Sequence, residues 1–80
     1  MTVKYHRKAR LTVTTNHDVF VIEKTWDSEY HYQMRFEFPS INDTWYKVEC
    51  DDGAALCVLT SEIIAVEETT LEYSKTGGEE

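Results

Sequence analysis

Residues 30–38 alternate apolar and polar side chains without interruption. The apolar positions are Tyr30, Tyr32, Met34, Phe36 and Phe38, and the polar positions are His31, Gln33, Arg35 and Glu37. Successive side chains of a β-strand point to opposite faces, so this pattern predicts a strand with one buried face and one solvated face. We expect Pro39 to end the strand, because proline has no N–H to donate, and other strands to cover its apolar face.

The segment before it predicts a β-hairpin. Residues 9–15 and 19–25 alternate, and Asn16 and His17 between them tolerate the positive φ that a two-residue type I′ turn requires. The predicted pairs are Thr15 with Asp18, Val13 with Phe20, and Leu11 with Ile22. This register places the apolar side chains of both strands on one face and leaves Val19 and Val21 on the other.

A second predicted hairpin joins residues 44–50 to residues 54–59 through the turn dipeptide Asp52-Gly53. The predicted pairs are Cys50 with Ala55 and Val48 with Cys57. Diagonal neighbours of this kind lie about 7–8 Å apart, beyond the reach of a disulfide, so we expect two free thiols packed in the core. Residues 54–59 are apolar on both faces, which predicts a central strand that is covered on both sides.

The end of the chain predicts one more strand. Residues 60–62 form either a short helix capped by Ser61 or, as we expect, a single 3₁₀-like turn, and residues 63–70 follow as a strand that Leu71 and Tyr73 extend. Residues 74–80 are polar and glycine-rich, which predicts a disordered acidic tail. The prediction is therefore one all-β domain at residues 1–73: an antiparallel meander of five to six strands, either a closed barrel or a bent sheet, of SH3-like or Sm-like size.

Charge is distributed unevenly along these 80 residues, whose net charge is −7. Residues 1–48 carry +1 and residues 49–80 carry −8. An acidic surface repels nucleic acids and attracts a basic protein, although acidity can also serve solubility alone. The candidate partner-binding acidic face consists of Glu37, Glu49, Asp51, Asp52, Glu62, Glu67, Glu68 and Glu72.

No pattern in the sequence predicts catalysis, a metal site or a cofactor. The three histidines lack zinc-site spacing, Cys50 and Cys57 are not a CxxC pair, and no glycine-rich phosphate loop is present. Cys50 lies among acidic residues, which should raise its pKa and weaken it as a nucleophile. We therefore expect a protein that is not an enzyme.

Two features bear on location and on nucleic acids. No apolar run approaches the roughly 18 residues of a membrane span, and the charged N-terminus lacks the apolar region of a signal peptide, so we expect a cytoplasmic protein. The only basic cluster is Lys4, Arg7, Lys8 and Arg10. A small barrel that binds nucleic acid through this cluster is the less favoured alternative, because the net charge opposes it.

Residues 45–68, WYKVECDDGAALCVLTSEIIAVEE, resemble the last hairpin and closing strand of small β-proteins encoded by bacteriophages and prophages. The matching residues are Trp45, Asp52, Gly53, Ile63, Val66 and Glu67. The resemblance implies a protein of the host-cell cytoplasm that is either an inhibitor of host nucleases, restriction or CRISPR systems, or a virion or assembly protein. The favoured hypothesis is a non-enzymatic acidic protein-binding module that occupies a basic, nucleic-acid-handling host protein. The alternative is a structural homo-oligomer that assembles through an exposed strand edge.

Overall fold

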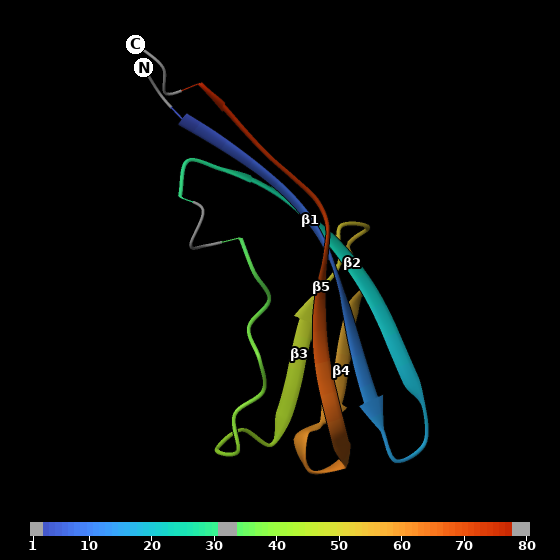
Figure 1. Cartoon of the computed structure of the whole chain (residues 1–80). Coiled ribbons are helices and arrows are strands. Elements are labelled where there is room, and N and C mark those ends of the chain that lie inside the picture. The colour runs from blue at the N-terminus through green and yellow to red at the C-terminus, as the bar shows by residue number, and fades with distance from the viewer. Residues whose placement is uncertain (1–2, 31–33, 78–80) are drawn as a thin grey trace.

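The computed structural model describes residues 3–30 and 34–77, which form five strands and one 3₁₀ turn (Figure 1). The elements are β1 (Val3–Thr15), β2 (Val19–Ser28), β3 (Trp45–Glu49), β4 (Ala55–Leu59), η2 (Thr60–Glu62) and β5 (Ile63–Gly77). The predicted all-β, single-domain, antiparallel fold is confirmed, as an open arrangement and not a closed barrel. None of the described residues belongs to a helix with the length and apolar character that a membrane crossing requires.

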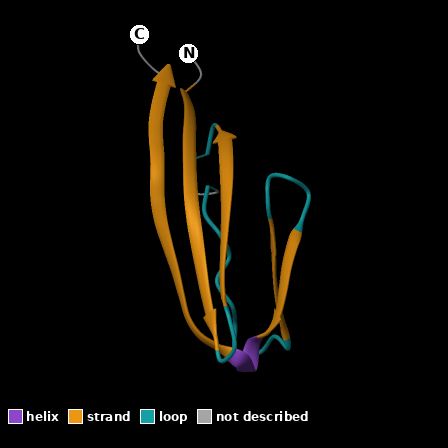
Figure 2. Cartoon of the chain, turned by 90° about the vertical axis from the view of Figure 1, so that its right-hand side faces the viewer, coloured by secondary structure: helices purple, strands orange, loops and turns teal. Residues whose placement is uncertain are grey.

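Two antiparallel sheets make up the domain. The first has the order β2-β1-β5, so β5 returns across the molecule to pair with β1, and the second is the β3–β4 hairpin. Figure 2 shows the hairpin as a separate layer that meets the larger sheet at the η2 turn. At the far end β1 and β5 run side by side, and Val3 at the start of β1 lies opposite Gly77 at the end of β5 (Figure 1).

One core lies between the layers. Ala9, Leu11 and Val13 from β1 are fully buried and form a single cluster with Tyr46, Val48 and Val58 of the hairpin and with Phe36. The face of the larger sheet that bears these β1 residues is called the inner face below, and the opposite face the outer face. Alternation along β1 puts apolar side chains on the inner face and Lys8, Arg10 and Thr12 on the outer face, which is why the sequence predicts this strand.

The first hairpin has the predicted register, with Leu11 opposite Ile22 and Val13 opposite Phe20. The predicted type I′ turn is wrong, because no described residue other than glycine has a positive φ. The Thr15 side chain organises the turn instead. Its hydroxyl oxygen accepts hydrogen bonds from the His17 and Asp18 N–H groups, at 3.2 and 3.0 Å, and its O–H donates to the Asp18 carbonyl. A threonine hydroxyl thus supplies the turn geometry without left-handed residues.

The second hairpin forms where the sequence predicts it, but one residue out of register. Val48 pairs with Leu56 and Lys47 pairs with Cys57. The reason is the loop: the Cys50 N–H bonds to the Ala54 carbonyl at 2.9 Å, and Gly53 adopts φ +87°. A type I turn followed by a left-handed glycine gives a three-residue loop, where the prediction assumed two.

The shifted register moves the cysteines. Cys50 and Cys57 are both free, but Cys57 lies exposed on the outward face of β4 beside Lys47, and Cys50 is only half-buried. The prediction that both pack in the core is wrong. The prediction of a doubly covered central strand is also wrong, because β4 pairs only with β3 and buries only one face.

Residues 34–38, called the crossing segment below, do not form the predicted strand. The alternation still decides burial at Met34 and Phe36, which are 2% and 6% exposed, whereas Phe38 is 54% exposed. Side chains take the place of a partner strand: Arg7 Nη1 donates to the Met34 carbonyl and Tyr46 Oη donates to the Glu37 carbonyl, both at 2.6 Å. Positions 31–33 of the predicted strand lie outside the described residues.

β5 is longer than the sequence predicts. The predicted 3₁₀ turn at residues 60–62 is confirmed, and the strand after it runs to Gly77, opposite Val3. A disordered tail is therefore wrong for residues 74–77, because the first residues of β1 offer them a ladder to pair with; residues 78–80 lie outside the described part. Two register shifts, at Lys8/Ala9 and at Thr14/Thr15, interrupt the β1–β5 pairing.

Candidate functional site

The eight acidic residues of the candidate face lie on separate surfaces. Glu67 and Glu68 point to opposite faces of β5, because successive strand residues alternate. Glu37 and Glu49 line a hollow together with Lys47. Asp51 and Asp52 lie in the loop of the second hairpin, beside β2. Glu62 lies in η2, and Glu72 lies on the outer face beside His6. No continuous acidic stripe results, and of these eight residues only Asp51 and Asp52 line the hollow beside the free edge of β2.

Glu68 is committed to an internal ion pair. It contacts Arg7 Nη1, and the two side chains are only 13% and 16% exposed. The same guanidinium donates to the Thr70 hydroxyl at 2.7 Å and lies 5.6 Å from the centre of the Trp26 ring. Arg7 therefore links β1, β2, β5 and the crossing segment, and neither partner is available to another molecule.

The rest of the predicted basic cluster is also largely neutralised. Lys8 and Arg10 both contact the Glu23 carboxylate across the β1–β2 pair, at 3.7 and 3.2 Å. Of the four basic residues only Lys4 has no ion pair among the described residues. No basic groove for a nucleic-acid backbone is formed by these four side chains.

His6 bridges the three strands of the larger sheet on the outer face. Its Nδ1 lies 3.0 Å from Asp27 on β2 and its Nε2 lies 3.3 Å from Glu72 on β5. The hydrogen bond to Asp27, followed by that to Glu72, raises the pKa of His6 above its usual value of 6.5. The protonated imidazolium donates to both carboxylates, which the neutral ring cannot do.

This contact predicts a pH dependence of stability. Because the folded-state pKa of His6 is raised, its stabilising contribution is fully present below pH 6.5 and is lost as the pH rises through the folded-state pKa. In urea unfolding over a pH series, wild type should therefore exceed His6→Gln in stability at low pH, and the difference should shrink as the pH rises. The double variant Asp27→Asn/Glu72→Gln should abolish that trend. A difference that stays constant with pH would contradict the bridge.

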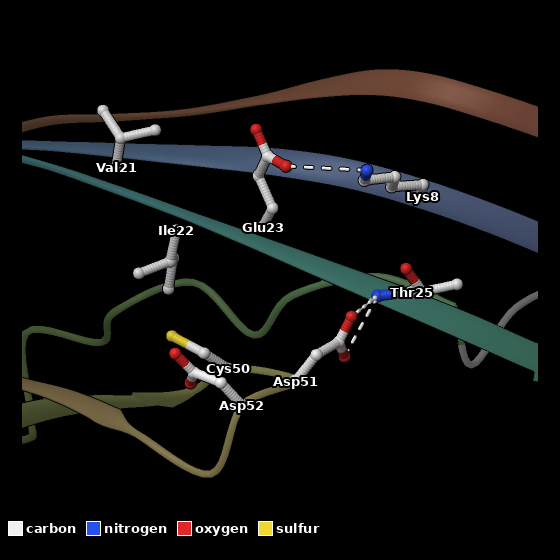
Figure 3. A pocket seen from close by; sticks show the side chains of 8 residues that line it. All are labelled: Lys8, Val21, Ile22, Glu23, Thr25, Cys50, Asp51 and Asp52. Carbon is white, nitrogen blue, oxygen red and sulfur yellow. Dashed lines mark hydrogen bonds and ion pairs between the residues drawn. The ribbon is translucent and has the colours of Figure 1, made fainter.

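The open surface beside Asp51 and Asp52 is a hollow at the free edge of β2 (Figure 3). We call it the edge hollow; it has a volume of about 500 Å³ and is lined by Lys8, Val21, Ile22, Glu23, Thr25, Cys50, Asp51 and Asp52. Figure 3 shows the Asp51 carboxylate reaching up from the hairpin loop to β2. Its two oxygens accept from the Thr25 N–H, at 3.0 and 3.2 Å.

This hydrogen bond shows which way the edge groups face. The Thr25 N–H points away from β1, and alternate residues of a regular antiparallel strand point their N–H the same way. The N–H groups of Val21 and Glu23 therefore face outward along the hollow. No backbone partner for them occurs among the described residues. The β1–β2 register is unbroken over this stretch.

Of the two edges of the larger sheet, β2 is the regular one. β5 forms the other edge, and the two register shifts give it irregular spacing. Bulges of this kind protect an edge from strand addition, whereas an even row of outward N–H and C=O groups favours it. Val19 and Val21 stand exposed on the outer face of β2 and add apolar surface to the same edge.

The chemistry of the edge hollow favours binding. Asp51 and Asp52 have no basic partner among the described residues, so they give its floor negative charge. Burial, with the charges of Asp52 and Asp51 adding to it, raises the pKa of the Cys50 thiol, as the sequence predicts. A thiol held protonated is a poor nucleophile. No group of metal-ligating side chains occurs among residues 3–30 and 34–77.

Sequence reasoning found the two carboxylates of this site but missed its other half. Thr25 and the backbone edge carry no side-chain signal, because any residue supplies an N–H. The one available signal is the pair of apolar residues, Val19 and Val21, on the face of β2 opposite Phe20 and Ile22. In comparisons with known proteins, no family model, no curated protein and no solved structure matches this chain.

Proposed function

We propose that this chain is a non-enzymatic protein-binding module that captures an extended, basic segment of another protein along the edge of β2. The observation that carries the proposal is the regular free edge beside the edge hollow. An extended segment that adds to such an edge gains main-chain hydrogen bonds, and its alternate side chains provide specificity. Asp51 already bonds to the edge at Thr25, so the segment would extend from there toward Val19.

The side chains beside the edge define the partner. On the outer face the segment meets Val19 and Val21, which favour β-branched apolar residues at alternate positions. On the inner side it meets Ile22 and the carboxylates Asp51 and Asp52, which favour lysine or arginine at the positions between. In the bacteriophage setting that residues 45–68 suggest, the partner is a basic host protein that the module inhibits by occupying its nucleic-acid-binding surface.

The proposal can be tested with a synthetic peptide of about ten residues in which valine alternates with lysine, long enough for a strand of typical length. NMR titration should show shift changes centred on Val21 and Glu23, with slower amide exchange at both residues. Affinity should fall as salt rises, because exposed charges are screened over about 8–10 Å near physiological ionic strength. A peptide that alternates valine with glutamate should bind much more weakly.

Two variants and a matched control sharpen the test. Val21→Pro removes the outward N–H without removing a ladder bond to β1, so it should abolish binding while circular dichroism stays unchanged. Asp52→Asn retains the acceptor oxygen that bonds to the Ala54 N–H but loses the charge, and should weaken binding. Glu67→Gln removes one charge from β5 and should have little effect. Equal binding of both peptides, or shift changes centred on β5, would refute the proposal.

A further inference from the structure

Three basic side chains from separate elements meet around a second hollow, which shares no lining residue with the edge hollow. Lys24 comes from β2, Arg35 from the crossing segment and Lys47 from β3. We call this the cationic hollow; it has a volume of about 370 Å³, and its other lining residues are Trp26, Phe36, Glu37, Val48 and Glu49. In a chain of net charge −7, such a concentration of positive charge is unexpected.

None of the three cations has an ion pair with a described carboxylate, whereas Arg7, Lys8 and Arg10 each have one. Glu37 and Glu49 line the same hollow without forming an ion pair with any of them. Three cations and two carboxylates leave the hollow with a net charge of +1, which an anion bound among the cations would offset. The arrangement is therefore one that a bound anion would stabilise.

The element carrying each cation is held in place. The Lys24 ammonium lies 5.7 Å from the centre of the Trp26 ring, and that ring packs edge-on against Phe36 at 5.0 Å. Cation–π contact of this kind restrains an ammonium that would otherwise move freely. The backbone on either side of Arg35 is fixed by hydrogen bonds at the Met34 and Glu37 carbonyls.

Lys47 is restrained by its strand. It stands on β3 between Tyr46 and Val48, both of which are buried in the core. Folding orders the backbone at all three positions, so ligand binding bears only the cost of ordering the exposed side chains of Arg35 and Lys47. Trp26, Phe36 and Val48 give the same hollow an apolar wall.

We propose that the cationic hollow binds a small phosphate monoester whose organic part carries hydroxyl groups. A phosphate monoester is close to doubly charged at neutral pH and matches the planar guanidinium of Arg35, with Lys24 and Lys47 as point charges. Its hydroxyl groups can donate to Glu37 and Glu49, which disfavours a bare polyanion, and its carbon skeleton packs on the apolar wall. This site is separate from the edge hollow, and the proposal does not depend on the protein-binding function.

The test uses the full chain and four probes: ribose 5-phosphate, AMP, adenosine and inorganic phosphate. Calorimetry should show binding of ribose 5-phosphate or AMP at millimolar or lower concentration, and no binding of adenosine. Inorganic phosphate should bind at least about tenfold more weakly, because it cannot make the hydrogen bonds to the carboxylates. NMR shift changes should appear at the amides of Lys24 and Lys47 and at the Trp26 indole N–H.

Substitutions inside and outside the cationic hollow distinguish specific binding in the hollow from nonspecific attraction of anions to positive charge. Arg35→Gln and Lys47→Gln should each weaken binding about tenfold, the loss of one hydrogen bond to a charged group. Lys4→Gln and Lys75→Gln remove the same charge outside the hollow and should leave affinity within about twofold, with circular dichroism confirming the fold of every variant. Failure of both phosphate monoesters to bind, equal binding of inorganic phosphate, or equal losses in all four variants would overturn the proposal.

Discussion

Replacing Arg7 by methionine is expected to lower the free energy of unfolding by about 3 kcal/mol, because it leaves the largely buried Glu68 carboxylate without its partner. It also removes the hydrogen bonds from the guanidinium to Thr70 and to the Met34 carbonyl. A domain of this size has little stability to lose. Urea unfolding followed by Trp fluorescence measures the change.

Arg10→Met is the matched control for Arg7→Met. Arg10 is exposed, and its ion pair with Glu23 is shared with Lys8, so its removal should cost no more than about 1 kcal/mol. The double variant Arg7→Met/Glu68→Leu removes both charges and should recover part of the loss. Equal effects of Arg7→Met and Arg10→Met would show that the Arg7 contacts contribute little to folding.

Phe36→Ala is expected to have the second large effect. It should lower the free energy of unfolding by about 3 kcal/mol, the usual cost of truncating a buried phenylalanine. Phe36 lies in the core cluster and makes an edge-on contact with Trp26 at 5.0 Å, although its backbone belongs to no strand. The same denaturation measurement gives the change. Phe36→Leu keeps most of the volume and should cost less than the alanine variant.

Phe38→Ala is the control for Phe36→Ala, two residues along the same alternating pattern. Phe38 is 54% exposed, so its truncation should change the free energy of unfolding by less than about 0.5 kcal/mol. The sequence alone gives the two phenylalanines equal weight. Similar losses at both positions would mean that residues 36–38 are buried as a strand after all, and that the core differs from the one described.

The candidate sites were only partly visible in the sequence. Asp51 and Asp52 are found by counting acidic residues, but their role comes from their position beside the Thr25 N–H. The cationic hollow combines Lys24 and Lys47 with Arg35, which are far apart in sequence and come together only when the two sheets pack with the crossing segment. Glu68 looks like a surface residue until the fold places it against Arg7.

The sequence by itself determined the first hairpin, its register and the 3₁₀ turn before β5. Alternation with a period of two, combined with a two-residue loop at Asn16 and His17, selects the pairing that puts Leu11, Val13, Phe20 and Ile22 on the same face. The tertiary structure decided three things that local patterns do not contain. Gly53 adopts a left-handed conformation that adds a residue to the second loop and moves Cys57 outward. The crossing segment satisfies its carbonyls with the side chains of Arg7 and Tyr46, so an alternating pattern is buried without becoming a strand. β5 pairs with β1 along its whole length because the side of β1 that faces away from β2 is long enough to order residues 74–77, which have no pattern of their own.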